Sequence, residues 1–73
     1  MDTIWLRRPS HDGGIDYVCF RALQGAVEIL EGYHLPPQMP LLKTRISLGL
    51  AQARHRQEHL EHCLGYRHGP PVF

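Results

Sequence analysis

The residues best suited to chemistry lie in one short segment, HRQEHLEHC, which runs from His55 to Cys63. It contains three histidines, two glutamates and one cysteine. Imidazole, carboxylate and thiolate groups are the side chains that bind zinc in proteins. The segment is therefore either a metal site or a solvated helix face rich in histidine, and the spacing of the histidines decides between these.

The three histidines share one face of a helix without meeting at one point. His55, His59 and His62 stand at i, i+4 and i+7, which places them in a narrow arc. His55 and His62 are about 10 Å apart along the axis, too far for one zinc ion with bonds of about 2.0–2.1 Å. A single zinc ion could use His55 with His59, or His59 with Cys63, and would need distant ligands such as His68, His34 or Cys19.

The spacing H-x-x-E-H at His55, Glu58 and His59 resembles the motif of the inverzincin metalloproteases, in which two histidines hold zinc and the glutamate activates water. No third ligand on a separate element and no substrate cleft accompany it. A Gly-rich phosphate loop, a Ser/His/Asp set and paired acid/base carboxylates are also missing. We expect no catalytic residues, no enzyme activity and no cofactor, with zinc on His59, Cys63 and His68 as the alternative.

The size and charge of the chain favour a binding protein. Its 73 residues form one small domain, which buries only about 60% of its unfolded surface, so a deep catalytic cleft is not expected. The net charge of +1 is far from the basic excess of a dedicated nucleic-acid-binding protein. Without a signal peptide or an apolar run of ~20 residues, we expect a cytoplasmic protein with no membrane contact and with reduced Cys19 and Cys63.

Helical periodicity predicts two helices and a mainly α fold. Apolar residues at spacings of three and four predict a first helix over residues 15–32, and an apolar stripe predicts a second over residues 40–65. The proline-rich residues 33–39 form a stiff connector between them. We expect a two-helix hairpin on which an N-terminal arm or short edge strand, residues 1–14, folds back, and a frayed tail over residues 66–73.

Two features leave other structures open. Asp12 and Gly13 form a dipeptide that favours tight hairpin turns, so residues 15–20 could be the second strand of an N-terminal β-hairpin in a small α+β protein. Gly49 is the point at which the second helix would break or change into a strand, because alternating apolar residues precede it.

The second helix would present two adhesive faces. Its main apolar stripe would pack inside the hairpin, and the residues that recur every seven positions opposite this stripe are Leu41, Leu48, His55 and His62. A second copy of the chain or a different protein would cover that face, so a homodimer is one expectation. A histidine-lined contact would weaken as the pH falls through about 6.5.

Aromatic and basic residues supply further candidate contacts. Tryptophan and arginine often carry binding energy at interfaces, which makes Trp5, Arg7 and Arg8 of the arm candidates. Arg45 and Arg56 would lie on one side of the second helix and could meet phosphates or an acidic protein patch. The expected partner-binding residues are Trp5, Arg7, Arg8, Arg45, Leu48, His55, Arg56, His59 and His62.

In size and make-up the chain resembles small phage-encoded proteins that bind host RNA polymerase, inhibit initiation and assist antitermination. The shared features are a single small domain, the lack of a set of catalytic residues, and surfaces left free for binding. No sequence motif is shared, so no residue's role is carried over. The resemblance implies a non-enzymatic transcription regulator in the host cytoplasm. It would dock on a host protein complex, with RNA polymerase as the expected one, and contact nucleic acid only within that complex. A dimeric accessory subunit or an inhibitor of another host system is the alternative.

Overall fold

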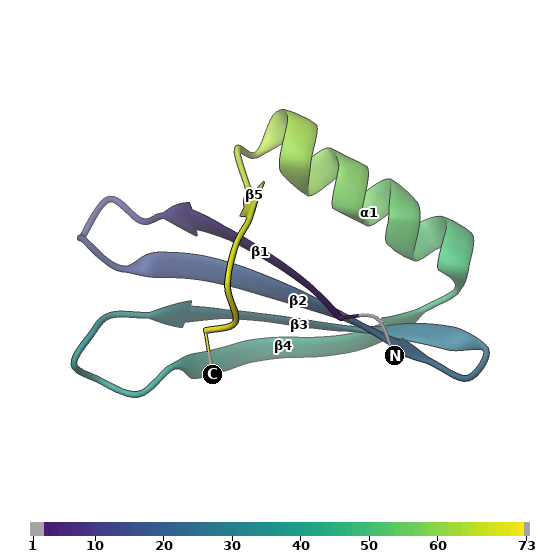
Figure 1. The fold of residues 1–73 in the computed structure, drawn as a ribbon, viewed down its shortest axis with the longest axis horizontal. Coiled ribbons are helices and arrows are strands. Elements are labelled where there is room, and N and C mark those ends of the chain that lie inside the picture. Colours follow the sequence, from purple (N-terminus) through teal and green to yellow (C-terminus); the bar gives the residue numbers. More distant parts are fainter. Residues whose placement is uncertain (1–2, 73) are drawn as a thin grey trace.

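The computed structural model describes residues 3–72, and within them the chain forms one antiparallel sheet with a helix on one face (Figure 1). Four strands follow one another as a meander: β1 (Thr3–Pro9), β2 (Ile15–Leu23), β3 (Ala26–His34) and β4 (Leu41–Leu48). The helix α1 (Leu50–Cys63) comes next, and the short strand β5 (Arg67–His68) then pairs with β1. The order across the sheet is β4-β3-β2-β1-β5.

The prediction of a helix over residues 15–32 is wrong, because this segment forms β2 and β3. The two strands meet at a tight turn in which Gly25 has a φ of 76°, a conformation that glycine adopts without strain. Both faces of β2 are apolar, since Val18 belongs to the core beneath the helix while Tyr17 and Cys19 are buried on the other side. Apolar spacings of three and four therefore arise here from a strand buried on both faces.

The prediction of a second helix over residues 40–65 is wrong in its first part, where the chain forms β4. The helix begins at Leu50, directly after Gly49, whose φ of −65° and ψ of 162° are extended. The expectations of a mainly α fold and of a small helical protein are therefore wrong. The residues that recur every seven positions are divided between β4, with Leu41 and Leu48, and the helix, with His55 and His62. They therefore form no continuous helical face.

The chain ends contribute more to the sheet than expected. The part of the predicted arm that is described forms β1, and the N-terminal hairpin of the alternative interpretation is present. Its turn contains Gly13 with a φ of 91°, and the backbone N–H of Ser10 donates to the carbonyl of Gly14 at 2.8 Å. The predicted tail contributes β5. The parts of the predicted arm and tail at residues 1–2 and 73 lie outside the described residues.

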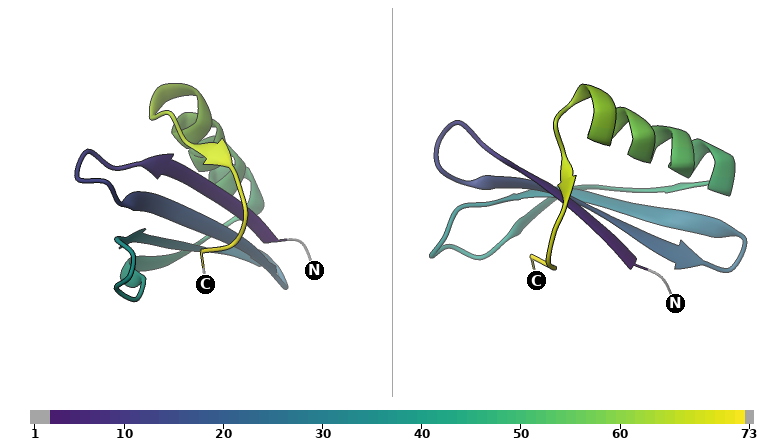
Figure 2. Two further views of the ribbon diagram at one scale, coloured as in Figure 1. Left: turned by 60° about the vertical axis from the view of Figure 1, so that its left-hand side comes forward. Right: turned by 45° about the horizontal axis from the view of Figure 1, so that its top comes forward.

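The main core lies between α1 and one face of the sheet (Figure 2). From the helix, only Ala53 and Leu60 are buried. From β4, no residue is fully buried, and Leu48 packs only at the border of the core. The buried cluster comprises Leu6, Val18, Phe20, Val27, Ile29, Ala53, Leu60 and Tyr66.

The opposite face, which we call the second face, has its own smaller apolar group. Tyr17, Cys19 and Leu30 are buried there. The ring of Trp5 lies 5.9 Å from that of Tyr17, measured between centroids. The hydroxyl of Tyr17 donates to the carbonyl oxygen of Leu41 at 2.8 Å, which ties the start of β4 to β2 across β3.

We predict that Gly32→Ala lowers the free energy of unfolding by about 1–3 kcal/mol, the usual cost of overpacking. Gly32 lies at a register irregularity between β3 and β4, and a Cβ there would overlap the Leu41 carbonyl oxygen and the Tyr17 ring. Urea unfolding followed by circular dichroism measures the change. Gly49→Ala, whose Cβ would meet open space, is the matched control. An unchanged unfolding midpoint in Gly32→Ala would contradict this packing.

Candidate functional site: the free edge strand β4

Within residues 3–72, β4 lies at the end of the sheet and pairs only with β3. Residues 41–47 are all exposed, and an edge strand leaves a row of backbone N–H and C=O groups unpaired on its outer side. Three large apolar side chains are exposed on this strand, Leu41 at 60%, Leu42 at 46% and Ile46 at 39%. Such an edge is a ready template for another strand.

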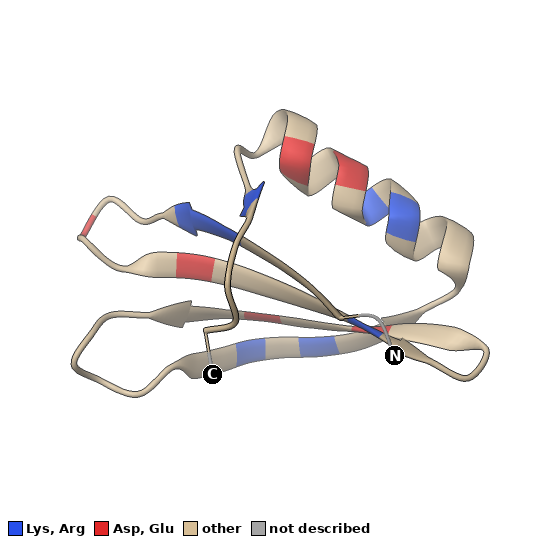
Figure 3. Cartoon of the chain, in the orientation of Figure 1, with Lys and Arg blue, Asp and Glu red and all other residues tan. Residues whose placement is uncertain are grey.

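The strand also carries positive charge, with two basic residues and no acidic one (Figure 3). The Nζ of Lys43 lies 5.6 Å from the centroid of the Tyr33 ring. The Nε of Arg45 lies 3.8 Å from the carboxylate of Glu28, yet 61% of the Arg45 side chain is exposed. The edge of β4 therefore combines apolar contact area with an excess of positive charge.

The opposite end of the sheet is protected against strand addition. β5 covers β1 at Leu6 and Arg7, and the backbone N–H of Gly69 donates to the carbonyl oxygen of Trp5 at 3.1 Å. Pro9 ends β1 and has no N–H to donate. Very short edge strands, prolines, lysines and bulges are devices by which proteins block edge pairing. β4 is neither very short nor interrupted by proline, but it carries Lys43 and a bulge opposite Glu31 and Gly32.

A pocket of about 340 Å³ adjoins β4 on the second face of the sheet. Its lining is mainly apolar and comes from β2, β3, β4 and the loop before β4. Met39 in that loop is 83% exposed, so one wall of the pocket is a flexible side chain. The lining residues are Tyr17, Arg21, Leu30, Met39, Pro40, Leu42 and Arg45.

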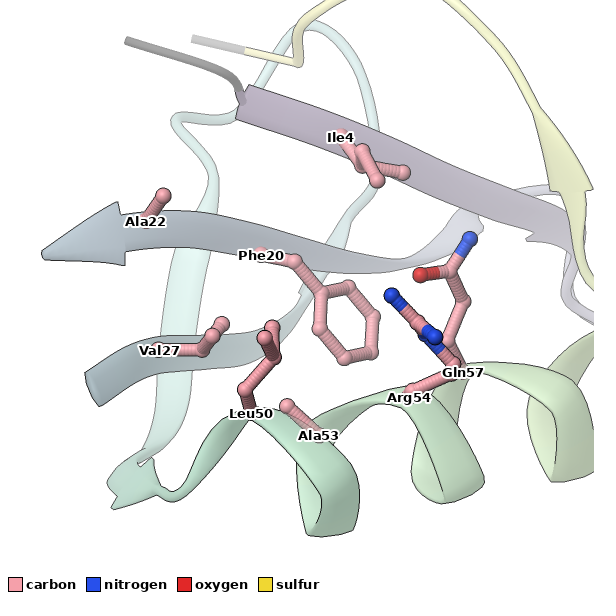
Figure 4. A pocket seen from close by; sticks show the side chains of 8 residues that line it. All are labelled: Ile4, Phe20, Ala22, Val27, Leu50, Ala53, Arg54 and Gln57. Carbon is pink, nitrogen blue, oxygen red and sulfur yellow. The ribbon is translucent and has the colours of Figure 1, made fainter. Parts of the chain in front are cut away.

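A cleft of about 270 Å³ opens on the helix side, between α1 and strands β1, β2 and β3. Figure 4 shows Arg54 and Gln57 projecting from the helix at its border, opposite Ile4 on β1. The small side chain of Ala53 is the buried helix residue here, so the helix does not fill the space beside Phe20. This cleft is an incompletely filled part of the core.

The histidines of α1 lie on its solvent side. His55, His59 and His62 are all exposed. No group of three or more histidine, cysteine, aspartate or glutamate side chains gathers into a metal-binding arrangement in the described part of the chain. His59, Cys63 and His68 are thus not brought together there, and the Nε2 of His68 instead lies 3.2 Å from the Glu61 carboxylate.

Arg8 makes contacts inside the molecule. Its Nη1 donates to the carbonyl oxygen of Leu64 at 2.7 Å, and its Nε donates to the carboxylate of Asp16 at 3.2 Å. Its guanidinium also lies 4.6 Å from the centroid of the Tyr66 ring. Arg8 therefore joins β1 and β2 to the end of α1, where a cation is favourable beside unpaired carbonyl groups.

Arg56 also makes its contact inside the molecule, because it donates from the middle of α1 to the carboxylate of Glu31 on β3.

The remaining predicted contact residues are spread over the molecule rather than gathered in one surface. Trp5 and Arg7 lie on β1 and face the second face, Arg45 and Leu48 lie on β4, and the histidines lie on α1. Sequence reasoning missed the exposed Leu42 and Ile46 as contact residues, although the alternation of apolar residues before Gly49 was a signal of a strand.

Cys19 is not an activated nucleophile. Both cysteines are free, Cys19 buried and Cys63 exposed. Burial raises the pKa of the Cys19 thiol, so it stays protonated at neutral pH, whereas nucleophilic attack requires the thiolate. Tyr66 has its pKa raised by burial as well.

Comparison with protein-family models, curated proteins and solved structures found no match to this chain. Among the described residues, no helix has the length and apolar character needed to cross a membrane. The edge of β4 and the adjoining pocket are therefore interpreted from their geometry alone.

We predict that Arg8→Met lowers the free energy of unfolding by about 1–2 kcal/mol. The change removes two charge-assisted hydrogen bonds and a cation–π contact, and its effect is reduced because the side chain is partly exposed. Arg7→Met on the opposite face of β1 is the matched control. Equal urea midpoints for the two variants would show that Arg8 does not hold the end of the helix.

We predict that Ala22→Ile raises the free energy of unfolding by about 0.5–2 kcal/mol, because Ala22 lines the cleft of Figure 4 and a larger apolar side chain would fill it. Thermal unfolding followed by circular dichroism measures the gain. Ala26→Ile on the neighbouring strand, outside the cleft lining, controls for strand propensity. If both variants gain equally, the cleft is not the cause.

Proposed function

We propose that this chain is a small non-enzymatic regulator that docks on a host protein assembly by accepting a strand of its partner at the edge of β4. The observation that carries the proposal is the exposure of residues 41–47 along an unpaired sheet edge. This edge replaces the helical face from which docking was expected, because that face is divided between β4 and α1.

Strand addition suits the physical character of β4. The added strand would satisfy the outer backbone groups, and each such hydrogen bond contributes about 0.5–1.5 kcal/mol net. β4 has eight residues, so a partner strand of ordinary length, about 5–6 residues, would be paired throughout. The exposed side chains of Leu41 and Ile46 would be buried by the same event.

A second copy of the chain is a poor occupant of this edge. Two β4 strands paired about a two-fold axis would bring Lys43 and Arg45 of both copies into one seam. β4 supplies no acidic residue to neutralise them, and like charges on facing strands are destabilising. A different protein with acidic side chains on its strand is the better complement.

Bacterial RNA polymerase is the first partner that we propose. Support comes from the resemblance in size and make-up to phage-encoded polymerase regulators. Docking there would place the regulator where it can inhibit initiation or assist antitermination, and nucleic acid would be contacted only within the complex.

We predict that the purified chain binds purified bacterial RNA polymerase and that binding protects the backbone amides of β4 from hydrogen exchange. Leu41→Lys should weaken binding by about tenfold or more, because it removes an apolar contact and adds charge to the edge. Leu64→Lys, the same substitution at an exposed leucine after α1, is the matched control and should bind as the natural chain does. Biolayer interferometry measures affinity, and mass spectrometry measures exchange.

These experiments test the identity of the partner and the mode of docking separately. Absence of binding by the natural chain would exclude the polymerase as its partner. Binding that leaves β4 unprotected and that Leu41→Lys does not weaken would exclude strand addition at this edge.

A further inference from the structure

We infer that the strand added to β4 carries one large apolar anchor residue that contacts the pocket on the second face, with an acidic residue two positions away on the side of Arg45. This inference rests on the proposed function, because it specifies the chemistry of the segment that docks at the same edge.

The direction of the side chains follows from strand geometry. Side chains of an added strand alternate between the two faces of the sheet, so every second one projects to the second face. On β4, Leu42 pairs with Gly32 and Arg45 with Leu30, and the irregularity between them brings both side chains to the second face although they are three residues apart. Leu42 and Arg45 also line the pocket. A second-face side chain of a strand paired with β4 would therefore stand beside the two β4 residues that line the pocket.

The size and polarity of the pocket suit a large apolar side chain. The pocket has a volume of about 340 Å³, well above the ~150 Å³ of an apolar cavity that binds benzene. Tyr17 and Leu30 in its lining are buried, so the apolar side chains that it exposes most are those of Met39 and Leu42. Met39 can move against an entering group. Phenylalanine, leucine and methionine have the polarity for such a pocket and would bury apolar area against Met39 and Leu42.

Positive charge gathers on one side of the pocket. Arg21 and Arg45 line it and share a single acid, with Glu28 at 3.4 Å from Arg21 and 3.8 Å from Arg45. Two guanidinium groups on one carboxylate leave an excess of positive charge and unused N–H donors. A carboxylate two positions from the anchor, on the side of Arg45, would meet these donors in a charge-assisted hydrogen bond.

The resulting pattern is an acidic and an apolar residue separated by one residue, x, which points to the helix side. A probe with an acidic residue on each side of the anchor fits either direction of the added strand. On that side β4 offers Leu41 and Ile46, so β-branched or other apolar residues suit the x positions. A segment of this kind has high strand propensity, and its charge keeps it soluble when unpaired.

Synthetic peptides provide the test, with binding to the natural chain measured by calorimetry and by NMR shifts of the β4 amides. The probe is the capped peptide TEVFVET, in which Glu, Phe and Glu share one face. TEVAVET lacks the anchor and TKVFVKT reverses the flanking charge. We expect TEVFVET to bind about tenfold more tightly than either comparison peptide, because each loses the burial of a large side chain or the charge pairing.

Two variants locate the contacts. Leu42→Glu places a carboxylate at the pocket and should abolish the preference for Phe over Ala, whereas Leu41→Glu, the same change on the opposite face of β4, should retain it. Arg45→Gln should remove most of the preference for Glu over Lys. Circular dichroism confirms that each variant is folded.

The result that would overturn the inference is equal binding of the three peptides, or binding of none of them. Equal binding of the three peptides with NMR shifts of the β4 amides would support strand addition. It would exclude a role for the apolar anchor and for acidic residues beside it. The polymerase experiment tests the docking function separately, since it depends on neither peptide chemistry nor Leu42.

Discussion

One helix is too narrow to cover this five-stranded sheet, and the edge strand β4 is left exposed as a result. Five strands spaced about 4.8 Å apart span about 19 Å, whereas an α-helix with its side chains is about 10–12 Å wide. The helix lies over the strands that contribute to the buried cluster, which are β1, β2 and β3, and leaves β4 outside it. Leu41 and Ile46 are exposed for this reason, although their strand pairs correctly with β3.

The helix is held on the sheet by charged groups as well as by apolar ones. Ala53 and Leu60 are its buried apolar residues, and between them Arg56 donates to the carboxylate of Glu31 on β3. Just beyond its end, Arg8 from β1 donates to the carbonyl oxygen of Leu64. These two arginines are therefore used in contacts within the fold. Among the other basic residues that the structure describes, Arg21, Lys43 and Arg45 lie on β4 or beside its pocket, whereas Arg7, Arg54 and Arg67 lie elsewhere.

The sequence predicted local features better than long-range ones. The hairpin signal at Asp12 and Gly13 and the break at Gly49 were both visible, because each depends on a few neighbouring residues. The pairing of β2 with β3 was missed because a strand that is buried on both faces lacks alternation and mimics helical spacing. Gly25, in the middle of the predicted helix, was the overlooked signal, since its positive φ closes the turn. The edge position of β4 depends on which strands pair, and no local pattern encodes that order.

Within the described residues, β4 is an edge strand whose outer side no other segment of the chain covers. Amide hydrogen exchange of the free protein measures this. We expect slow exchange for the paired amides of β2 and β3 and fast exchange for the outward amides of β4, so that rates alternate along residues 41–48. Uniformly slow exchange along β4, at the level of β2 and β3, would instead show that the edge is already occupied.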